Sequence, residues 1–360
     1  MDRIECILKE LTEAFGPSGF EDSVRKIMRR ELLGLSDTIT TDGIGSLIAQ
    51  LPGSKANPRI MLAAHMDEVG LMVKYITADG FVKFQQLGGW LDQSLLGQRW
   101  RIMTGKQEVI GVTGVKTPHV MGAEERRNGL KLDNLFIDIG ATSQKDAEDR
   151  LGIRPGDPIV PVSEFARLDE GRLYLGKAWD DRVGLAVILE VARALNNNHP
   201  PNTVHAIGTV QEEVGLRGAR TSSYVVKPDI GINIEAGVAG DYPGITKDEA
   251  QERLGGGPTI FLHDSMMLPN VNLRNLVETV AKANNITVQF NVLKGYGEDG
   301  AEIQRSRTGT PTVNIAIPTR YLHSHNGIIN RSDFDSAVRL VTAVIHSLDS
   351  DVCDSLTSFD

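Results

Sequence analysis

Apolar residues near the start of the chain recur at the spacing of an α-helix. The members of this pattern are Ile4, Leu8, Leu11 and Phe15. Side chains three or four positions apart lie on one face of a helix, so the pattern predicts an amphipathic helix that Gly16 and Pro17 bring to an end. Ser18 and Glu21 have the spacing of a capping box and predict the start of a second helix, which continues to about residue 33.

The pattern changes between residues 69 and 162. Short apolar runs such as 70–76 and 107–113 alternate here with glycine-rich turns, and helical spacing is nearly absent. Runs of this kind, rich in valine and isoleucine, predict β-strands. We therefore expect a small β module inserted into the surrounding domain. The charged stretch 124–129 within it predicts a mobile surface loop.

Helical and strand patterns alternate on either side of this module. Strands are predicted at residues 59–64, 204–210, 230–234 and 312–317, and helices at residues 183–195, 273–283 and 334–348. Such alternation predicts an α/β fold whose mixed, largely parallel sheet has helices on both faces. We expect a discontinuous α/β domain at residues 1–67 and 165–350, the β module at 68–164, and a loose polar tail at 351–360.

Five side chains that can bind a metal follow predicted strands. They are His65, Asp180, Glu213, Glu235 and His323. In an open α/β sheet, ligands bind beyond the carboxyl ends of the strands, where segments distant in sequence meet. Imidazole nitrogen and carboxylate oxygen suit zinc and several other divalent cations. The set therefore predicts a metal centre with room for two ions, of the kind that hydrolases use.

Two neighbours of this set add chemistry to it. Glu212 and Glu213 leave a strand consecutively, so their side chains point in opposite directions and only one of them can face a given ion. The other is free to act as a general base. Asp67 lies two positions beyond His65, where it can orient the imidazole ring.

Simpler interpretations stay open for two members of the set. Asp180 and Asp181 open a predicted helix, so either could serve only as a helix cap. His325 lies two positions beyond His323 and could replace it as the ligand.

Composition excludes several classes of partner. The formal net charge of −9 argues against nucleic acid and against anionic membrane surfaces. The N-terminus has no signal-peptide core, and no apolar run approaches the roughly 18 residues of a membrane span. Cys6 and Cys353 are the only cysteines and have no paired spacing, so we expect two buried structural thiols and a cytoplasmic location.

Two other functions are disfavoured by the context of their motifs. Residues 295–300 match the glycine pattern of dinucleotide-binding loops, but the motif comes late in the chain, and Arg320 stands where that fold has an acidic residue. A glycosidase needs two carboxyl groups that face each other across about 5 to 9.5 Å. Consecutive glutamates that point in opposite directions do not provide this arrangement.

Five motifs together resemble the tetrahedral aminopeptidases, also called glutamyl or deblocking aminopeptidases, which are di-metal exopeptidases. The motifs are Phe15-Gly-Pro-Ser-Gly, Ala64-His-Met-Asp-Glu-Val-Gly, Lys177-Ala-Trp-Asp-Asp-Arg-Val-Gly, Val210-Gln-Glu-Glu-Val-Gly-Leu-Arg-Gly-Ala and Arg320-Tyr-Leu-His-Ser. The similarity extends over nearly the whole chain.

The resemblance implies a division of the ligands between two divalent cations. Asp180 would bridge the two ions. His65 and Glu235 would hold one, and Glu213 and His323 the other. Zinc is the expected metal, with cobalt and manganese as alternatives.

The resemblance also implies roles beyond the ligands. Glu212 would be the general base, and Asp67 would orient His65. Residues near 68–164 would form a small β-barrel-like dimerisation domain, and the dimers would assemble into a hollow tetrahedral dodecamer.

Two positions depart from the pattern of the family. Glu235 stands where many members have aspartate, and its longer side chain is expected to affect metal preference. The Gly-Gly-Thr-Asp loop of the family is replaced here by Tyr296-Gly-Glu298-Asp299, and the added negative charge is expected to change which substrate side chain is accepted.

The expected activity is the release of N-terminal amino acids from short peptides that have a free N-terminus. Two alternatives remain. A di-metal amidase or deacylase would share the metal site without requiring the free amine, and an inactive assembly subunit would keep the fold without the chemistry.

Overall fold

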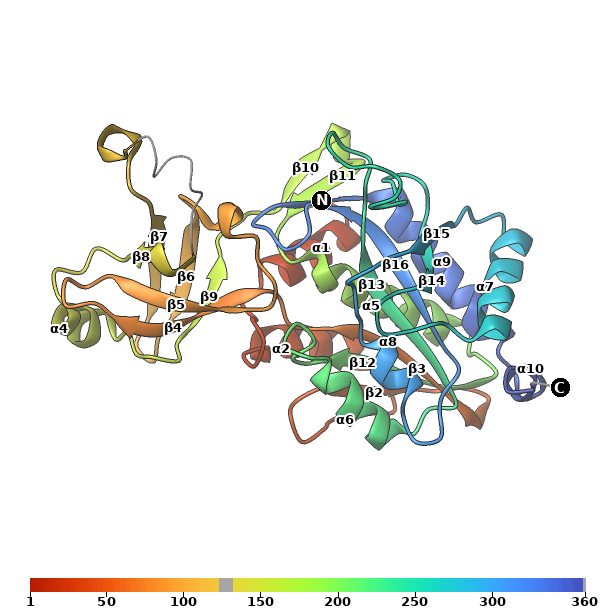
Figure 1. Ribbon diagram of the computed structural model, residues 1–360. Coiled ribbons are helices and arrows are strands. Elements are labelled where there is room, and N and C mark those ends of the chain that lie inside the picture. Colours follow the sequence, from red (N-terminus) through yellow and green to blue (C-terminus); the bar gives the residue numbers. More distant parts are fainter. Residues whose placement is uncertain (123–131, 359–360) are drawn as a thin grey trace.

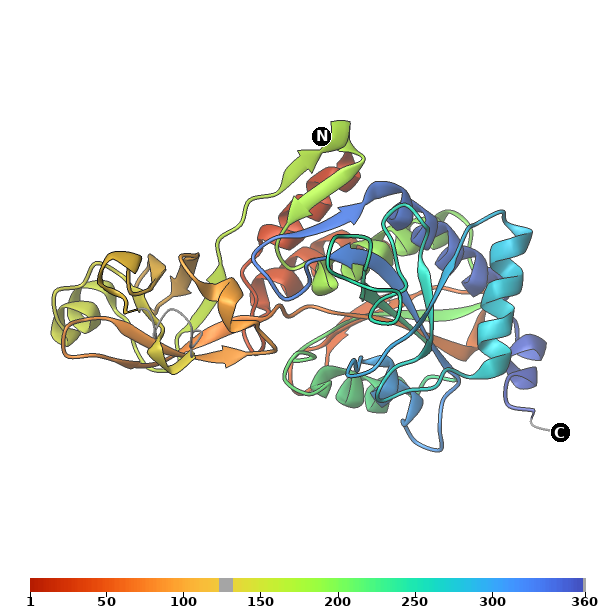
Figure 2. The same ribbon diagram turned by 45° about the horizontal axis from the view of Figure 1, so that its top comes forward.

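The computed structural model describes residues 1–122 and 132–358, so the predicted loop at 124–129 lies outside the described residues. Figure 1 shows a large α/β body and a smaller β body beside it. In Figure 2 the smaller body again stands apart from the larger one and is joined to it by a few extended segments. The prediction of an α/β fold with an inserted β module is confirmed.

A mixed sheet forms the centre of the α/β body. Its main path follows the order β1-β2-β12-β3-β13-β16-β17-β11-β10, with β14 and β15 attached to β16. Parallel pairing joins the four central strands β12, β3, β13 and β16, and antiparallel pairing extends the sheet on both sides. The carboxyl ends of the four central strands therefore meet at one edge. The strands are β1 (Thr38–Thr41), β2 (Leu47–Leu51), β3 (Lys55–His65), β10 (Ala166–Leu168), β11 (Leu173–Gly176), β12 (Asn202–Thr209), β13 (Ile230–Val238), β14 (Thr259–His263), β15 (Gln289–Val292), β16 (Thr312–Arg320) and β17 (Gly327–Asn330).

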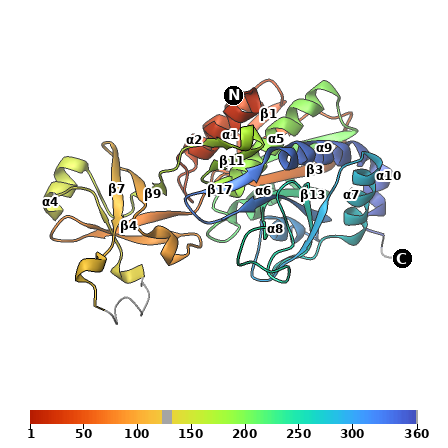
Figure 3. The ribbon, with the colours of Figure 1, turned by 90° about the horizontal axis from the view of Figure 1, so that it is seen from above.

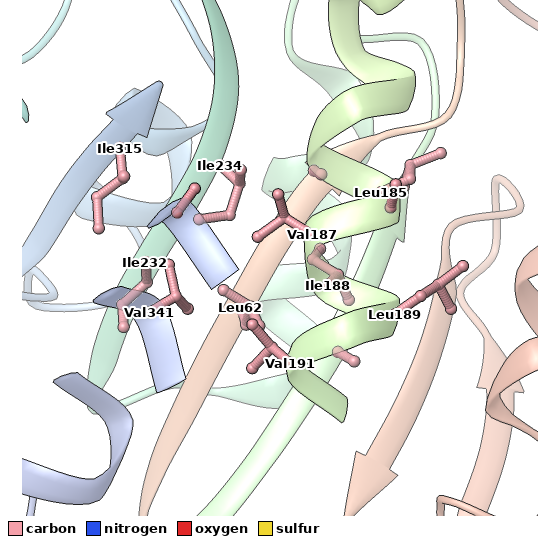
Figure 4. Packing of buried hydrophobic residues seen from close by; sticks show 14 of the residues in the cluster. Leu62, Leu185, Val187, Ile188, Leu189, Val191, Ile232, Ile234, Ile315 and Val341 are labelled. Atoms are coloured by element: carbon pink, nitrogen blue, oxygen red, sulfur yellow. The ribbon is translucent and has the colours of Figure 1, made fainter. Parts of the chain in front are cut away.

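Helices cover both faces of this sheet, because its central strands are apolar on both sides. In β3, Leu62 packs in the main core cluster, whereas Met61 and Ala63 pack in a separate cluster on the opposite face. Figure 4 shows α5 lying over β3 and β13, with Val187 and Val191 near Leu62. In Figure 3, α6 and α8 lie on the side of the sheet away from α5 and α9. The helices are α1 (Arg3–Glu13), α2 (Asp22–Leu32), α5 (Trp179–Asn197), α6 (Arg217–Val226), α7 (Val271–Ala283), α8 (Gly300–Gln304), α9 (Arg331–Ser347) and α10 (Ser350–Ser355).

The inserted module is a closed six-stranded barrel with the order β4-β5-β8-β7-β6-β9. It has its own apolar core, in which Trp90 and Trp100 meet edge to face. The barrel elements are β4 (Gly70–Ile76), β5 (Val82–Leu87), β6 (Arg99–Met103), β7 (Glu108–Gly114), β8 (Phe136–Asp138), β9 (Pro158–Pro161) and the short helix α4 (Gln144–Asp146).

The predicted capping box at Ser18 and Glu21 is wrong. Helix α2 begins after Glu21, whose side chain makes no cap hydrogen bond to the helix and instead accepts the backbone N–H of Gly19. The Ser18 hydroxyl donates to Oδ2 of Asp67 at 2.6 Å. A serine with capping spacing is thus used to hold a carboxylate from the end of β3.

Two expectations about the ends of the chain are also corrected. Cys353 is buried as predicted, but Cys6 is exposed, because it falls on the outer face of α1. Residues 351–355 of the predicted loose tail belong to α10, whose Asp349 cap accepts the N–H of Val352. Leu356 is buried just beyond it, so this segment packs on the domain. Among the described residues, no helix is both long and apolar enough to cross a membrane.

Candidate metal centre

The candidate ligands meet at the carboxyl edge of the central parallel strands. His65 is the last residue of β3 and pairs in register with Thr209, the last residue of β12. On the other side, Asn233 of β13 pairs with Ala63, which brings Glu235 to the level of His65. Glu235 therefore lies inside β13 rather than beyond its end, since the strand continues to Val238.

Asp180 lies between the two predicted imidazole ligands. Its Oδ1 is 2.8 Å from Nε2 of His65, and its Oδ2 is 3.3 Å from Nε2 of His323. The two oxygens of one carboxylate thus face two different imidazoles. A carboxylate placed in this way has one oxygen available for each of two cations.

The other carboxylates divide between these imidazoles. Glu235 Oε1 is 3.6 Å and Glu212 Oε2 is 4.0 Å from Nε2 of His65. Glu213 Oε1 is 3.5 Å from Nε2 of His323. Consecutive Glu212 and Glu213 therefore face different imidazoles, but strand alternation is not the reason, because β12 ends at Thr209 and both glutamates lie in the loop that follows it. All five candidate ligands and Glu212 come together in one place.

His323, not His325, reaches this cluster. The ring of His325 is buried against Trp100, with ring centroids 4.5 Å apart, and burial lowers its pKa to about 4. His323 has a left-handed backbone with φ 53°, which turns its ring toward Asp180. Positive φ in a non-glycine residue costs roughly 1–3 kcal/mol and persists only where the surrounding structure holds it.

Asp181 is the ligand-competent residue that the sequence interpretation missed. Its oxygen lies within 4.8 Å of ligand atoms of both His65 and Glu235. Both aspartates have non-helical backbone angles, but the Asp181 carboxylate accepts the N–H of Gly184 at 3.0 Å, whereas the Asp180 carboxylate faces the imidazoles. The helix-cap role that was open to both aspartates thus falls to Asp181. The sequence shows the Asp180-Asp181 pair, but it does not show which of the two faces the imidazoles and which caps the helix.

Asp67 organises the loop that carries the two glutamates. Its carboxylate accepts the N–H of Glu212 at 2.9 Å and the N–H of Glu213 at 3.1 Å. Nδ1 of His65 lies 3.0 Å from the backbone oxygen of Asp67 and 3.5 Å from its carboxylate. The ring of His65 therefore contacts chiefly the main chain of Asp67, while the carboxylate holds the glutamate loop.

Two glycines of the inserted β module lie against the candidate ligands Glu213 and His323. A Cβ on Gly88 would come within 3.0 Å of Oε2 of Glu213, and a Cβ on Gly89 within 3.4 Å of Nδ1 of His323. Hydrogen bonding to the main chain of Gly89 also contributes to the raised pKa of His323. Gly88 has φ +78°, which glycine adopts without strain. A side chain at position 88 would therefore crowd Glu213, whereas a Cβ at position 89 would only touch His323.

A buried ion pair joins the segments that carry His65 and Asp180. Lys177 Nζ is 2.6 Å from Oε1 of Glu68, and Arg182 Nη2 is 3.5 Å from the same oxygen. All three side chains are almost fully buried. Burial lowers the pKa of Lys177 to about 8, although the Glu68 carboxylate opposes this shift.

The charges of the cluster fit bound cations. Oε1 of Glu213 and Oε2 of Glu235 are buried and have no hydrogen-bond donor among the described residues. Burial raises the pKa of Glu213 to about 8 and that of Glu235 to about 7, and the nearby imidazoles offset only part of the effect. Buried carboxylates without partners are costly unless a proton or a cation neutralises them. The donor set of imidazole and carboxylate is one that divalent metals accept.

Comparison with known proteins gives the family. The model of the M42 glutamyl aminopeptidases matches residues 45–340. The chain belongs to this family. Membership confirms the resemblance drawn from the motifs, and it makes the protein a metallo-aminopeptidase, a hydrolase of peptide bonds.

Individual members of the family align over almost the whole chain. The glutamyl aminopeptidase of Lactococcus lactis subsp. cremoris is 34% identical over 96% of both chains. The solved structure of a TET aminopeptidase from the marine sediment archaeon Thaumarchaeota archaeon SCGC AB-539-E09 has a TM-score of 0.97 and 42% identity over 99% of each chain. The TET1 peptidase of Pyrococcus horikoshii, described as able to assemble into a tetrahedron or a large octahedral shell, has a TM-score of 0.86 and 30% identity over 96% of this chain and all of its own.

Proposed function

We propose that the enzyme removes N-terminal amino acids from short peptides with a free N-terminus, using two divalent cations that share Asp180. The observation that carries this proposal is the placement of the Asp180 oxygens at 2.8 Å from His65 and 3.3 Å from His323. His65 and Glu235 would hold one ion, and Glu213 and His323 the other. Zinc is the expected metal, with cobalt and manganese as alternatives.

Two cations bound there would supply a Lewis acid for the peptide carbonyl and make the attacking water more acidic. Glu212 would accept the proton of that water and return it to the leaving amine. Its Oε2 is 4.0 Å from Nε2 of His65, so it reaches the centre without being the nearest oxygen to either imidazole. Burial raises the pKa of Glu212 well above its ordinary value, and bound cations would oppose this shift and keep the carboxylate able to accept a proton.

The adjacent glutamates provide a matched pair of variants. Glu212→Gln should keep about two cations per chain and lose about 10²- to 10⁴-fold in kcat, the usual contribution of a general base. Glu213→Gln should instead lower the cation content, because it alters a ligand. Metal analysis and peptide hydrolysis measure both quantities. Near-normal turnover by Glu212→Gln would remove Glu212 from this role.

The free amine requirement separates the proposal from its alternatives. A peptide and its N-acetylated form should be cleaved at very different rates, with the acetylated form nearly inert. Equal rates would favour a di-metal amidase or deacylase. A preparation that binds no cation and cleaves neither peptide would favour an inactive assembly subunit.

We also propose that the barrel, within residues 68–164, mediates association into a homo-oligomer. Ile110 and Val112 of β7 point outward and are exposed, as is Met103 of β6. Together with a solved relative that is described as a dodecamer, and with the tetrahedral assembly described for the Pyrococcus horikoshii TET1 peptidase, this supports a dodecamer. Native mass spectrometry should give twelve chains, and Ile110→Lys should reduce the assembly. A monomeric wild-type protein would contradict the proposal.

A further inference from the structure

Glu298 is held beside the metal centre by the residues on either side of it. It lies in the loop between β15 and α8. The Tyr296 hydroxyl donates to the backbone oxygen of Ala236, the residue after a candidate ligand, at 2.5 Å. Asp299 accepts a hydrogen bond from Thr209, the last residue of β12. The loop is thus tied to two central strands at the edge where the ligands meet.

Glu298 is the carboxylate here that lacks any donor. Its side chain is 1% exposed, and neither of its oxygens has a hydrogen-bond partner among the described residues. Neighbouring acids are supplied with donors. Asp264 accepts the N–H groups of Met266 and Met267, both at 2.7 Å, and Glu252 accepts from the amide of Asn291 at 2.5 Å. A buried carboxylate with two free oxygens calls for a cationic partner.

The described chain does not supply that cation. After burial, the strongest influences on Glu298 are the carboxylates of Glu235, Asp264, Glu252 and Asp180, and all of them raise its pKa. Nor is Glu298 part of a third metal site, because the groups of three metal-competent side chains found among the described residues do not include it. In the free enzyme a proton would neutralise Glu298, and in the substrate complex a cationic group of the substrate would take its place.

We propose that Glu298 binds the terminal ammonium or guanidinium of the substrate's N-terminal side chain, so that the enzyme prefers peptides that begin with lysine or arginine. This proposal depends on the proposed aminopeptidase function and names its substrate class. Met266, Tyr296 and Phe261 offer apolar contacts for the long stem of such a side chain, and Met266, which packs closely on Gly297, must move to admit it. A Cβ on Gly297 would meet Sδ of Met266 at 2.4 Å, and the Tyr296 ring packs on Phe261. Methionine is flexible enough to make room beside Glu298.

Lysine and norleucine provide the sharpest pair of probes, because they differ only in the terminal ammonium. The wild-type enzyme should hydrolyse lysine p-nitroanilide with a kcat/KM about 10- to 100-fold above that for norleucine p-nitroanilide, the range expected of a charge-assisted hydrogen bond. Glu298→Gln should abolish the difference by a loss on lysine alone. The matched control is Glu302→Gln in α8, whose carboxylate lies 3.1 Å from Arg305 near the surface, and it should keep the preference.

Three outcomes would overturn the proposal. An equal loss on both substrates would assign Glu298 to the α-amine, which lysine and norleucine share. An unchanged preference in Glu298→Gln would remove Glu298 from recognition. A wild-type enzyme that prefers norleucine, or an acidic residue, would contradict the assigned substrate class. Unfolding temperature and cation content, measured on each variant, should match the wild type and so exclude a folding or metal defect.

A binding measurement separates failure of this proposal from failure of the proposed function. Calorimetric titration with free lysine and free norleucine needs no turnover. Tighter binding of lysine, lost in Glu298→Gln, would support the site even if no peptide were cleaved. Equal binding of the two amino acids by an enzyme that does cleave peptides would overturn the role of Glu298 and leave the aminopeptidase function intact.

Discussion

The carboxylate of Asp67 accepts the backbone N–H of Glu212 at 2.9 Å. The contact joins the end of β3 to the loop that follows β12, so the candidate base depends on a residue from another strand. The same carboxylate also holds the N–H of Glu213 and the hydroxyl of Ser18. One buried acid thus positions both consecutive glutamates.

Asp67→Asn should lower cation affinity about 10- to 100-fold, the usual effect of changing a group that supports metal ligands. The asparagine amide keeps one acceptor oxygen. Its NH₂ group would face a hydrogen-bond donor that the second carboxylate oxygen accepts in the wild type. Ser18→Ala is the matched control, because it removes one donor and leaves the carboxylate in place, and its effect should be smaller. Competition with a chromogenic chelator measures both variants. Wild-type affinity in Asp67→Asn would contradict this role.

The barrel should be required for a complete metal centre. In Gly88→Ala the new Cβ would lie 2.7 Å from Val69 and 3.0 Å from Oε2 of Glu213. We expect the ion beside Glu213 and His323 to bind more weakly while the other is retained, so that cation content falls toward one per chain. Gly97→Ala is the control, because it has a similar φ of +66° with nothing within 4 Å. Equal cation content in the two variants would show that Gly88 does not support the ligand.

The buried ion pair of Glu68 and Lys177 should contribute strongly to stability. Lys177→Met leaves the Glu68 carboxylate buried with only Arg182 at 3.5 Å. We expect a loss of about 3–5 kcal/mol in the free energy of unfolding, as for other broken buried pairs. Arg172→Met, which breaks the exposed pair with Asp169, should cost no more than about 1 kcal/mol. Urea unfolding followed by fluorescence compares the two, and equal effects would contradict the account.

Chelated enzyme should become less stable as the pH rises. Burial raises the pKa of Glu213 to about 8 and that of Glu235 to about 7, from an ordinary value of 4.5. Between pH 4.5 and pH 8, these two groups therefore hold more protons in the folded apo-protein than in the unfolded chain. The stability that these two groups contribute is therefore full below about pH 4.5 and is lost as the pH rises toward 8. The pKa of His323, about 10 and above its usual 6.5, acts in the same direction at higher pH.

Because cations replace these protons, zinc should raise the unfolding temperature more at pH 8 than at pH 6. Thermal unfolding with zinc and with chelator, at both pH values, measures the two differences. A zinc effect that does not change with pH would contradict the assignment of Glu213 and Glu235 as buried, cation-neutralised ligands.

The sequence predicted those features that follow from periodicity and strand direction. His65 and Glu213 lie where strand ends place them, and the switch to short apolar runs marked the barrel. Contacts between segments distant in sequence were not predictable. Ser18 had the spacing of a helix cap, yet its hydroxyl bonds to Asp67, because capping competes with other donors and acceptors that only the folded chain brings near.

The sequence also did not predict which of two neighbouring residues takes a given role in the site. The choice between His323 and His325 depends on the tryptophans of a separate domain, which surround His325. The sequence left the cap role open to either Asp180 or Asp181, and the position of Asp181 beside His65 depends on the irregular start of α5. The Gly88-Gly89 pair was visible in the sequence, but nothing local showed that metal ligands lie against it.

Anomalous X-ray diffraction from crystals of the zinc-loaded enzyme tests the central claim most directly. The account predicts two anomalous peaks per chain, one on each side of Asp180, with one about 2.0–2.1 Å from Nε2 of His65 and the other at that distance from Nε2 of His323. A single peak, or two peaks that Asp180 does not join, would contradict it.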